Sequence, residues 1–163
     1  MKSQLSQEAT VKVPAKEFWE VYRGLERPRL LHELKPDYVG KPEVIEGDGG
    51  VGTRVKIGTP TGTFWGDSHT IELYKRVDDE KRIFELEIVE GGIKLLGFDQ
   101  CSLRLEIIEK DVETTVVRST LDFEIDDKLV HNIPLVKMEY FQTVAEIIAE
   151  HLNKKRAETN AAA

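Results

Sequence analysis

The chain has 163 residues, of which 40% are hydrophobic and 33% charged, as expected of one ordinary globular domain with a substantial core. Its 30 acidic residues outnumber its 23 Lys and Arg, and the net charge of −7 argues against nucleic acid or an anionic membrane surface as a partner. A single cysteine, Cys101, excludes an intrachain disulfide, and no apolar run approaches the ~20 residues of a membrane span. We therefore expect a cytoplasmic protein that forms one domain over residues 1–163.

The first part of the chain predicts a strand followed by two short helices. Residues 5–13 alternate loosely between polar and apolar side chains and end at Pro14, which can begin a helix. Amphipathic helices are predicted over residues 15–24 and 28–35. Two short helices placed here suit a V-shaped brace at one edge of a curved sheet.

A glycine-rich segment follows these helices. Gly47, Gly49 and Gly52 fit the G-x-G-x-x-G pattern of dinucleotide-binding folds, in which a helix after the glycines holds the phosphates at its N-terminus. Here residues 53–57 alternate polar and apolar, which indicates a strand. The pattern therefore favours a compact connection between two strands, in which glycine takes positive φ angles.

The middle of the chain predicts a meander of antiparallel strands with one buried face. Apolar and polar side chains alternate in each strand, except that the first of them has no wholly apolar face. The strands are expected over residues 64–74, 83–90, 94–108 and 114–125, with turns at 59–62, 78–81 and 91–92.

The hydrophobic spacing changes to three and four residues in the last part of the chain. The apolar stripe consists of Leu135, Met138, Phe141, Ala145, Ile148 and Leu152. It predicts a long amphipathic helix that begins near Pro134, followed by a flexible tail from about residue 154. A helix across a curved sheet can leave a cavity that suits an apolar ligand, but Met138 and Phe141 would equally fit a solid core.

Three segments resemble one family. Residues 45–53, Ile-Glu-Gly-Asp-Gly-Gly-Val-Gly-Thr, are similar to the glycine-rich loop of the plant pathogenesis-related class 10 family, the Bet v I superfamily. Residues 18–22, Phe-Trp-Glu-Val-Tyr, and residues 89–92, Val-Glu-Gly-Gly, add to the resemblance, which is strongest to the branch containing norcoclaurine synthases. It extends over residues 5–152.

The resemblance implies an α+β helix-grip fold. This fold has a curved seven-stranded antiparallel sheet, two short helices and one long C-terminal helix over an internal cavity. The cavity implies a small hydrophobic or aromatic ligand as the partner, with no cofactor and no metal. The histidines agree with the absence of a metal, because they are dispersed in the sequence without metal-ligand spacing.

Glu72 is the candidate catalytic residue. The resemblance places it at the position of the cavity glutamate of the norcoclaurine synthases, so Ser68, Thr70 and Tyr74 share its inward face, although a β-bulge could reverse the parity locally. Desolvation in an apolar cavity disfavours the charged form of a carboxylate, which would suit Glu72 to accept and return protons near neutral pH. Without the resemblance, a solvated strand residue is the simpler interpretation.

Other polar positions of the norcoclaurine synthases are not retained. The resemblance aligns their essential lysine with Phe84, their cavity tyrosine with Thr70 and their aspartate with Leu103. Because phenylalanine cannot protonate a carbonyl, we do not expect the norcoclaurine reaction by that mechanism. We expect a more apolar cavity whose ligand-binding residues are Ser68, Thr70, Tyr74, Phe84, Leu86, Leu103, Met138 and Phe141.

Two functions stay open at this point. The first is a cofactor-independent enzyme of plant specialised metabolism that uses Glu72 in an acid–base cyclisation, condensation or isomerisation. The second is a carrier or sensor of a plant hormone or another hydrophobic metabolite, in which Glu72 and Tyr74 hydrogen-bond the ligand. We expect a monomer or a weak homodimer in either case.

Overall fold

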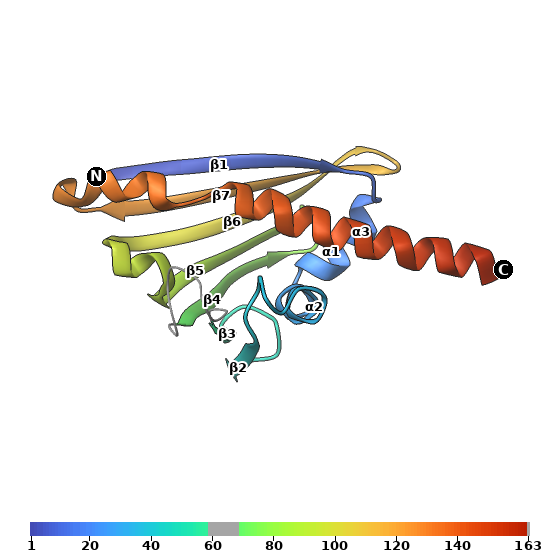
Figure 1. The fold of residues 1–163 in the computed structure, drawn as a ribbon, viewed down its shortest axis with the longest axis horizontal. Helices are drawn as coiled ribbons and strands as arrows, with labels where there is room; N and C mark the ends of the chain where they lie inside the picture. Colours follow the sequence, from blue (N-terminus) through green and yellow to red (C-terminus); the bar gives the residue numbers. More distant parts are fainter. Residues whose placement is uncertain (59–68, 163) are drawn as a thin grey trace.

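The computed structural model describes residues 1–58 and 69–162, and in it one antiparallel sheet curves around a long C-terminal helix (Figure 1). The sheet has seven strands in the order β1-β7-β6-β5-β4-β3-β2, so the first and the last strand of the chain are neighbours. The strands are β1 (Lys2–Val11), β2 (Pro42–Glu46), β3 (Arg54–Gly58), β4 (His69–Asp78), β5 (Ile83–Gly91), β6 (Phe98–Asp111) and β7 (Thr114–Ile125). This is the predicted seven-stranded helix-grip architecture.

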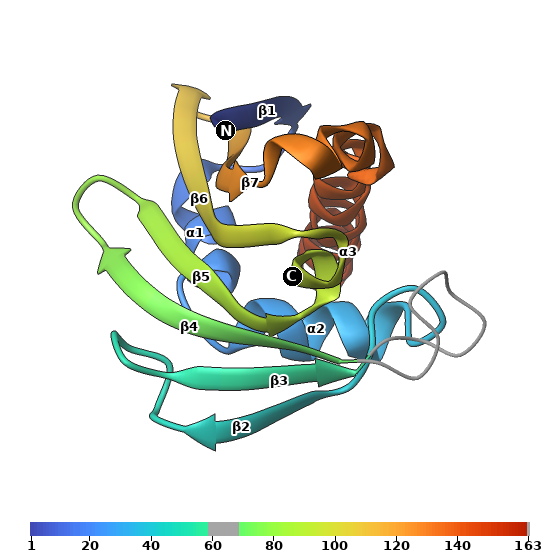
Figure 2. The same cartoon turned by 90° about the vertical axis from the view of Figure 1, so that its left-hand side faces the viewer.

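The helices lie on the concave side of the sheet (Figure 2). Helices α1 (Ala15–Tyr22) and α2 (Glu26–Leu34) fill the connection from β1 to β2, and both pack against α3 (Glu139–Ala162). Two 3₁₀ helices, η1 (Gly92–Leu96) and η2 (Asp127–Leu135), precede β6 and α3. No helix in the described part of the chain is long and apolar enough to cross a membrane.

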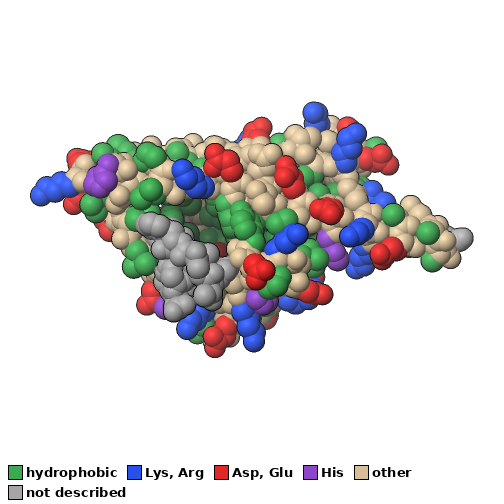
Figure 3. Space-filling model, in the orientation of Figure 1, with side chains coloured by type: hydrophobic (Ala, Val, Ile, Leu, Met, Phe, Trp, Pro, Cys, Tyr) green, Lys and Arg blue, Asp and Glu red, His purple; other side chains and the backbone are tan. Residues whose placement is uncertain are grey.

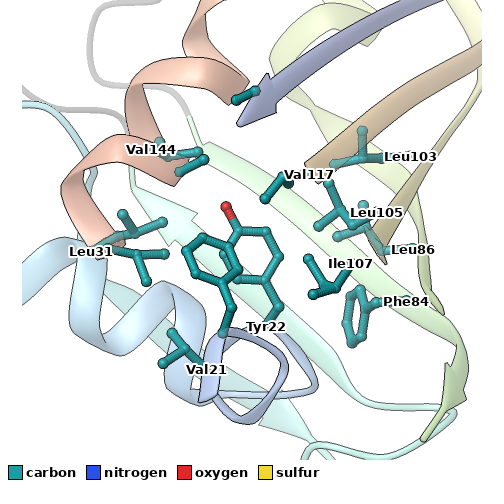
Figure 4. Packing of buried hydrophobic residues seen from close by; sticks show 14 of the residues in the cluster. Val21, Tyr22, Leu31, Phe84, Leu86, Leu103, Leu105, Ile107, Val117 and Val144 are labelled. Carbon is teal, nitrogen blue, oxygen red and sulfur yellow. The ribbon is translucent and has the colours of Figure 1, made fainter. Parts of the chain in front are cut away.

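The core forms where the inner face of the sheet meets the helices. Strict alternation along β6 and β7 turns one set of side chains inward, among them Leu105, Ile107 and Val117. Figure 4 shows Tyr22 of α1 between this sheet face and the residues Leu31 and Val144 of the other helices. Each large apolar side chain that is fully buried contributes about 1.5–3 kcal/mol, so this junction fixes α3 over the sheet.

The glycine-rich segment connects β2 to β3, as predicted, and no helix follows it. Gly47 has a φ of +95°, and a Cβ atom there would lie 2.4 Å from Oγ1 of Thr53. The same Thr53 hydroxyl accepts a hydrogen bond of 2.9 Å from the backbone N–H of Gly49. The glycines therefore serve a tight strand connection, and the dinucleotide interpretation does not apply.

Several predicted boundaries were wrong. The strand expected from residue 94 begins only at Phe98, because the preceding residues form the 3₁₀ helix η1. Glycines with positive φ angles, Gly91, Gly92 and Gly97, lie at the two ends of that helix. The strand expected over residues 64–74 continues to Asp78, and its first half lies outside the described residues.

The C-terminal helix also differs from its prediction at both ends. Pro134 lies inside η2, and Val136 has an extended backbone with ψ 114°, which interrupts the helical period before α3 begins at Glu139. Towards the C-terminus, α3 continues to Ala162, beyond residue 154, where the flexible tail was predicted to begin. Leu135 consequently lies outside α3 and is 46% exposed.

Candidate functional site

A half-open cavity of about 430 Å³ lies between the inner face of the sheet, the loop after α2 and the start of α3. Its volume falls within the ~300–1,000 Å³ range of small-molecule sites. Figure 3 shows hydrophobic side chains gathered in a hollow on the face that α3 crosses. The cavity is lined by Asp37, Tyr38, Val39, Gly40, Ile57, Gly58, Thr70, Glu72, Leu86, Ile88, Gly92, Ile93, Leu103, Leu121, Leu135, Val136, Lys137, Tyr140 and Phe141.

Five of the nine residues proposed from the sequence lie in the cavity wall. They are Thr70, Glu72, Leu86, Leu103 and Phe141. The inward parity of β4 holds from Thr70 to Tyr74, although the pairing of β4 with β5 shifts register on either side of Glu72. A bulge therefore does not reverse this face of the strand.

Of the other four residues, the three that the structure describes lie outside the cavity wall. Tyr74 and Phe84 are completely buried beside the cavity, where their rings pack edge to face with centroids 4.7 Å apart. The Tyr74 hydroxyl points away to the backbone oxygen of Gly24, to which it donates at 3.4 Å. Met138 packs against the core just before α3 begins, and Ser68 lies outside the described residues.

The carboxylate of Glu72 has a charged partner that the sequence did not suggest. In β4, Glu72 pairs with Val55 of β3 and Ile88 of β5, which points its side chain into the cavity wall. Nη2 of Arg27 in α2 lies 3.3 Å from Oε1 of Glu72, and the two side chains are only 10% and 12% exposed. The expectation of an isolated acid in apolar surroundings is therefore wrong.

Arg27 is a buried cation held by aromatic groups as well as by Glu72. Its Cζ atom lies 5.9 Å from the centroid of the Phe84 ring, within cation–π distance. Burial works against its charged form, but Glu72 and nearby tyrosines outweigh burial and raise the pKa of Arg27. Nε of Arg27 and the hydroxyl of Tyr22 are both buried without a hydrogen-bond partner among the described residues.

Two tyrosines form an aromatic pair at the start of α3. The rings of Tyr38 and Tyr140 stack with centroids 5.4 Å apart, and both residues line the cavity. Tyr140 is 36% exposed, and desolvation of its hydroxyl raises its pKa, with Arg27 lowering it and Glu72 raising it. The hydroxyl of Tyr140 therefore stays protonated within the field of both charges.

The sequence did contain signs of the residues that were missed. Arg27 precedes Leu30 and Leu31 by three and four positions, so it lies on the buried stripe of α2. Tyr140 precedes the buried Val144 by four positions, which places it on the side of α3 that faces the sheet. A charged or aromatic residue at such a helical spacing from buried residues could have indicated both side chains.

Other candidates have ordinary structural roles. His69 contacts Glu90 at 2.7 Å, and Cys101 is buried, which raises the pKa of its thiol to about 12. A second hollow of about 530 Å³ beside the glycine-rich segment is lined by charged side chains that pair with each other, such as Arg23 with Asp79 at 2.7 Å. In residues 1–58 and 69–162, no three His, Cys, Asp or Glu side chains could hold a metal ion.

Comparisons with known proteins agree with this geometry. The sequence matches the Pathogenesis-related protein Bet v 1 family over residues 1–155. Norbelladine synthase from Narcissus pseudonarcissus is 38% identical over 157 residues, which cover 96% of each protein. S-norcoclaurine synthase 1 from Papaver somniferum is 30% identical over 158 residues, covering 96% of this chain and 68% of that protein. The structure of norcoclaurine synthase from Thalictrum flavum with dopamine and hydroxybenzaldehyde has a TM-score of 0.81 at 25% identity, covering 94% of this chain and 88% of that one.

Proposed function

Because the chain belongs to the Pathogenesis-related protein Bet v 1 family, we propose that its cavity binds small aromatic plant metabolites, and that Glu72 catalyses their condensation or cyclisation without a cofactor. The observation that carries the proposal is the placement of Glu72, a carboxylate that is only 12% exposed, in the wall of a largely apolar cavity. Enzyme sites commonly combine an apolar pocket with a few convergent polar groups.

An aromatic amine and an aromatic aldehyde are the substrate classes that we propose. The norcoclaurine synthase that resembles this chain holds dopamine and hydroxybenzaldehyde in its structure. In this chain, Tyr38, Tyr140 and Phe141 offer aromatic faces in the cavity wall, against which flat rings can stack. The relatives named norbelladine synthase and norcoclaurine synthase support the same class of reaction.

Glu72 would move the protons of such a condensation. Its carboxylate takes a proton from the substrate ammonium, which leaves a free amine and a neutral carboxylic acid. The amine nitrogen then adds to the aldehyde carbon, and one of its protons passes to the former aldehyde oxygen, which gives a carbinolamine. Glu72 returns its proton to the departing hydroxyl, so that water leaves, an iminium ion forms and the carboxylate is restored. Arg27 takes no proton in this sequence because a guanidinium stays charged.

A carrier or sensor function is the second candidate. It is favoured by the apolar side chains of Leu86, Leu103 and Leu121 in the cavity wall, which offer no second proton donor. In that function, Glu72 would accept a hydrogen bond from the ligand, and the ligand would leave unchanged.

Incubation with dopamine and hydroxybenzaldehyde, followed by mass spectrometry of the product, tests the proposal. We expect a condensation product with the wild-type protein and a decrease on the order of 100-fold or more in its rate with Glu72→Gln. Glu109→Gln is the control, because Glu109 is an exposed acid on β6 and should leave the rate unchanged. Binding of both compounds with no product would favour the carrier, and equal rates in the wild type and Glu72→Gln would refute catalysis by Glu72.

A further inference from the structure

A second buried charge lies behind Glu72, outside the cavity wall, and it bears on which ligands can bind. The other charged residues that line the cavity, Asp37 and Lys137, are exposed. We propose that Arg27 is a specificity-determining residue: it balances the charge of Glu72 and thereby selects ligands that are uncharged when bound. The inference rests on the proposed function, since it concerns the same cavity and the same ligand classes.

Glu72 and Arg27 lie at different distances from the cavity. Glu72 lines the cavity, whereas Arg27 does not, and contacts Glu72 through Nη2 at 3.3 Å from Oε1. Among the described residues, no other hydrogen bond reaches the Glu72 carboxylate. Oε1 faces Arg27, and Oε2, on the cavity side of the pair, accepts no hydrogen bond from the described residues.

Both charges act on the groups in the cavity wall. Arg27 and Glu72 shift the pKa of the Tyr140 hydroxyl in opposite directions, and Tyr140 is itself a lining residue. Because both side chains are about nine-tenths buried, water screens their fields less than at the surface. A charged ligand beside Glu72 would therefore interact with Arg27 as well.

The consequence differs between ligand charges. An ammonium group is attracted by Glu72 and repelled by Arg27, so the pair holds it less firmly than an isolated carboxylate would. For a neutral amine or a phenolic aldehyde, the opposite charges of Arg27 and Glu72 act as a dipole, and neither charge repels the ligand. The arrangement thus favours the free amine, which is the form that attacks a carbonyl carbon.

A role in stability alone does not explain every feature of the contact between Arg27 and Glu72. Polar groups that stabilise a core are normally satisfied by hydrogen bonds. In this cluster, Nε of Arg27 and the hydroxyl of Tyr22 have no partner among the described residues. If the ion pair served stability alone, we would expect Nε of Arg27 to have a hydrogen-bond partner.

Binding measurements with three small phenolic ligands of different charge test the inference. The probes are dopamine as the cation, hydroxybenzaldehyde as the neutral compound and hydroxybenzoate as the anion. Relative to hydroxybenzaldehyde, we expect dopamine to bind about tenfold more tightly to Arg27→Met and about tenfold more weakly to Glu72→Gln. Glu72→Gln should also bind hydroxybenzoate more tightly than the wild type does.

Arg29→Met is the matched control, because Arg29 lies on the same helix but is 56% exposed and pairs with Glu26 and Glu33. It should leave all three affinities unchanged. The inference is overturned if Arg27→Met shifts the three affinities by one common factor, or if Arg29→Met reproduces its effect. A wild-type protein that binds none of the three probes would instead overturn the proposed function, and this inference with it.

Two further variants keep the test decisive if Arg27→Met does not fold. Arg27→Lys retains the positive charge and should keep the wild-type preference among the three probes. The double variant Arg27→Met with Glu72→Gln has no buried charge to leave unpaired, and its order of preference should lie between those of the single variants. A double variant that prefers dopamine as strongly as expected for Arg27→Met would contradict the inference.

Discussion

The guanidinium of Arg27 lies over the ring of Phe84, with its Cζ atom 5.9 Å from the ring centroid. A cation from helix α2 and a ring from strand β5 thus meet next to the carboxylate of Glu72, from segments that are distant in the sequence. This contact holds α2 against the strands that form the cavity wall. A change in the packing of α2 would therefore also move the charge of Arg27 relative to Glu72.

We expect Phe84→Leu to lower the free energy of unfolding by about 1–3 kcal/mol, because it removes part of a fully buried ring and its contact with the cation. Urea denaturation measures this change. In an Arg27→Met background the same substitution should have a smaller effect, since the cation–π contribution is already lost. Equal effects in both backgrounds would show that the ring and the guanidinium do not interact.

The aromatic pair of Tyr38 and Tyr140 gives a prediction about binding. Tyr140→Leu removes a stacking face from the cavity wall, and we expect the Kd for hydroxybenzaldehyde to rise about tenfold. Tyr140→Phe keeps the ring and should bind almost as the wild type does. Isothermal titration calorimetry distinguishes the two variants, and an equal loss in both would assign the effect to the hydroxyl.

The glycine-rich connection allows a comparison of two neighbouring glycines. Gly47→Ala should destabilise the protein by roughly 2 kcal/mol or more, because its φ is +95° and the new Cβ would lie 2.4 Å from Oγ1 of Thr53. Gly50→Ala is the control, since the nearest atom to its Cβ, a carboxylate oxygen of Asp48, lies at 3.4 Å. Thermal unfolding of both variants would contradict this account if the two melting temperatures fell equally.

A buried tyrosine predicts a loss of stability in alkali. Burial raises the pKa of Tyr74, which is fully buried, to about 12, from about 10 for an unfolded chain. Below pH 10 both the folded and the unfolded chain keep this proton, and above it only the unfolded chain releases it readily. Stability should therefore fall as the pH rises from 10 through 12. Denaturation with urea at several pH values measures the slope, which Tyr74→Phe should reduce; an unchanged slope would rule out a contribution from Tyr74.

Periodicity located much of the fold and part of the site. Alternation with period two put Thr70 and Glu72 on one face of β4, and the resemblance to the norcoclaurine synthases, not the alternation, indicated that this face points inward. The sequence could not indicate which charged residue would meet Glu72. That contact depends on how α2 packs over the sheet, and a charge such as Arg27 on a short helix is usually turned to solvent.

The errors at the ends of elements have a similar origin. Apolar residues recur every three or four positions around Ile133 and Leu135. This spacing is compatible with both a 3₁₀ helix and an α-helix. Residues 136–138 separate η2 from α3, and the extended backbone of Val136, which tertiary packing decides, interrupts the helical period. Tyr38 lies in the loop after α2, where no period operates, so its place in the cavity wall had no sequence signature.

The pairing of β1 with β7 joins Lys2 to Glu124 and Val11 to Thr115, which places the beginning of the chain against its last strand. During synthesis on the ribosome, β1 therefore emerges more than a hundred residues before its partner and has no neighbour in the sheet until then. Contacts of such long sequence separation form slowly. We expect the nascent chain to remain incomplete until its C-terminal third has been translated, and to depend on chaperones during that interval.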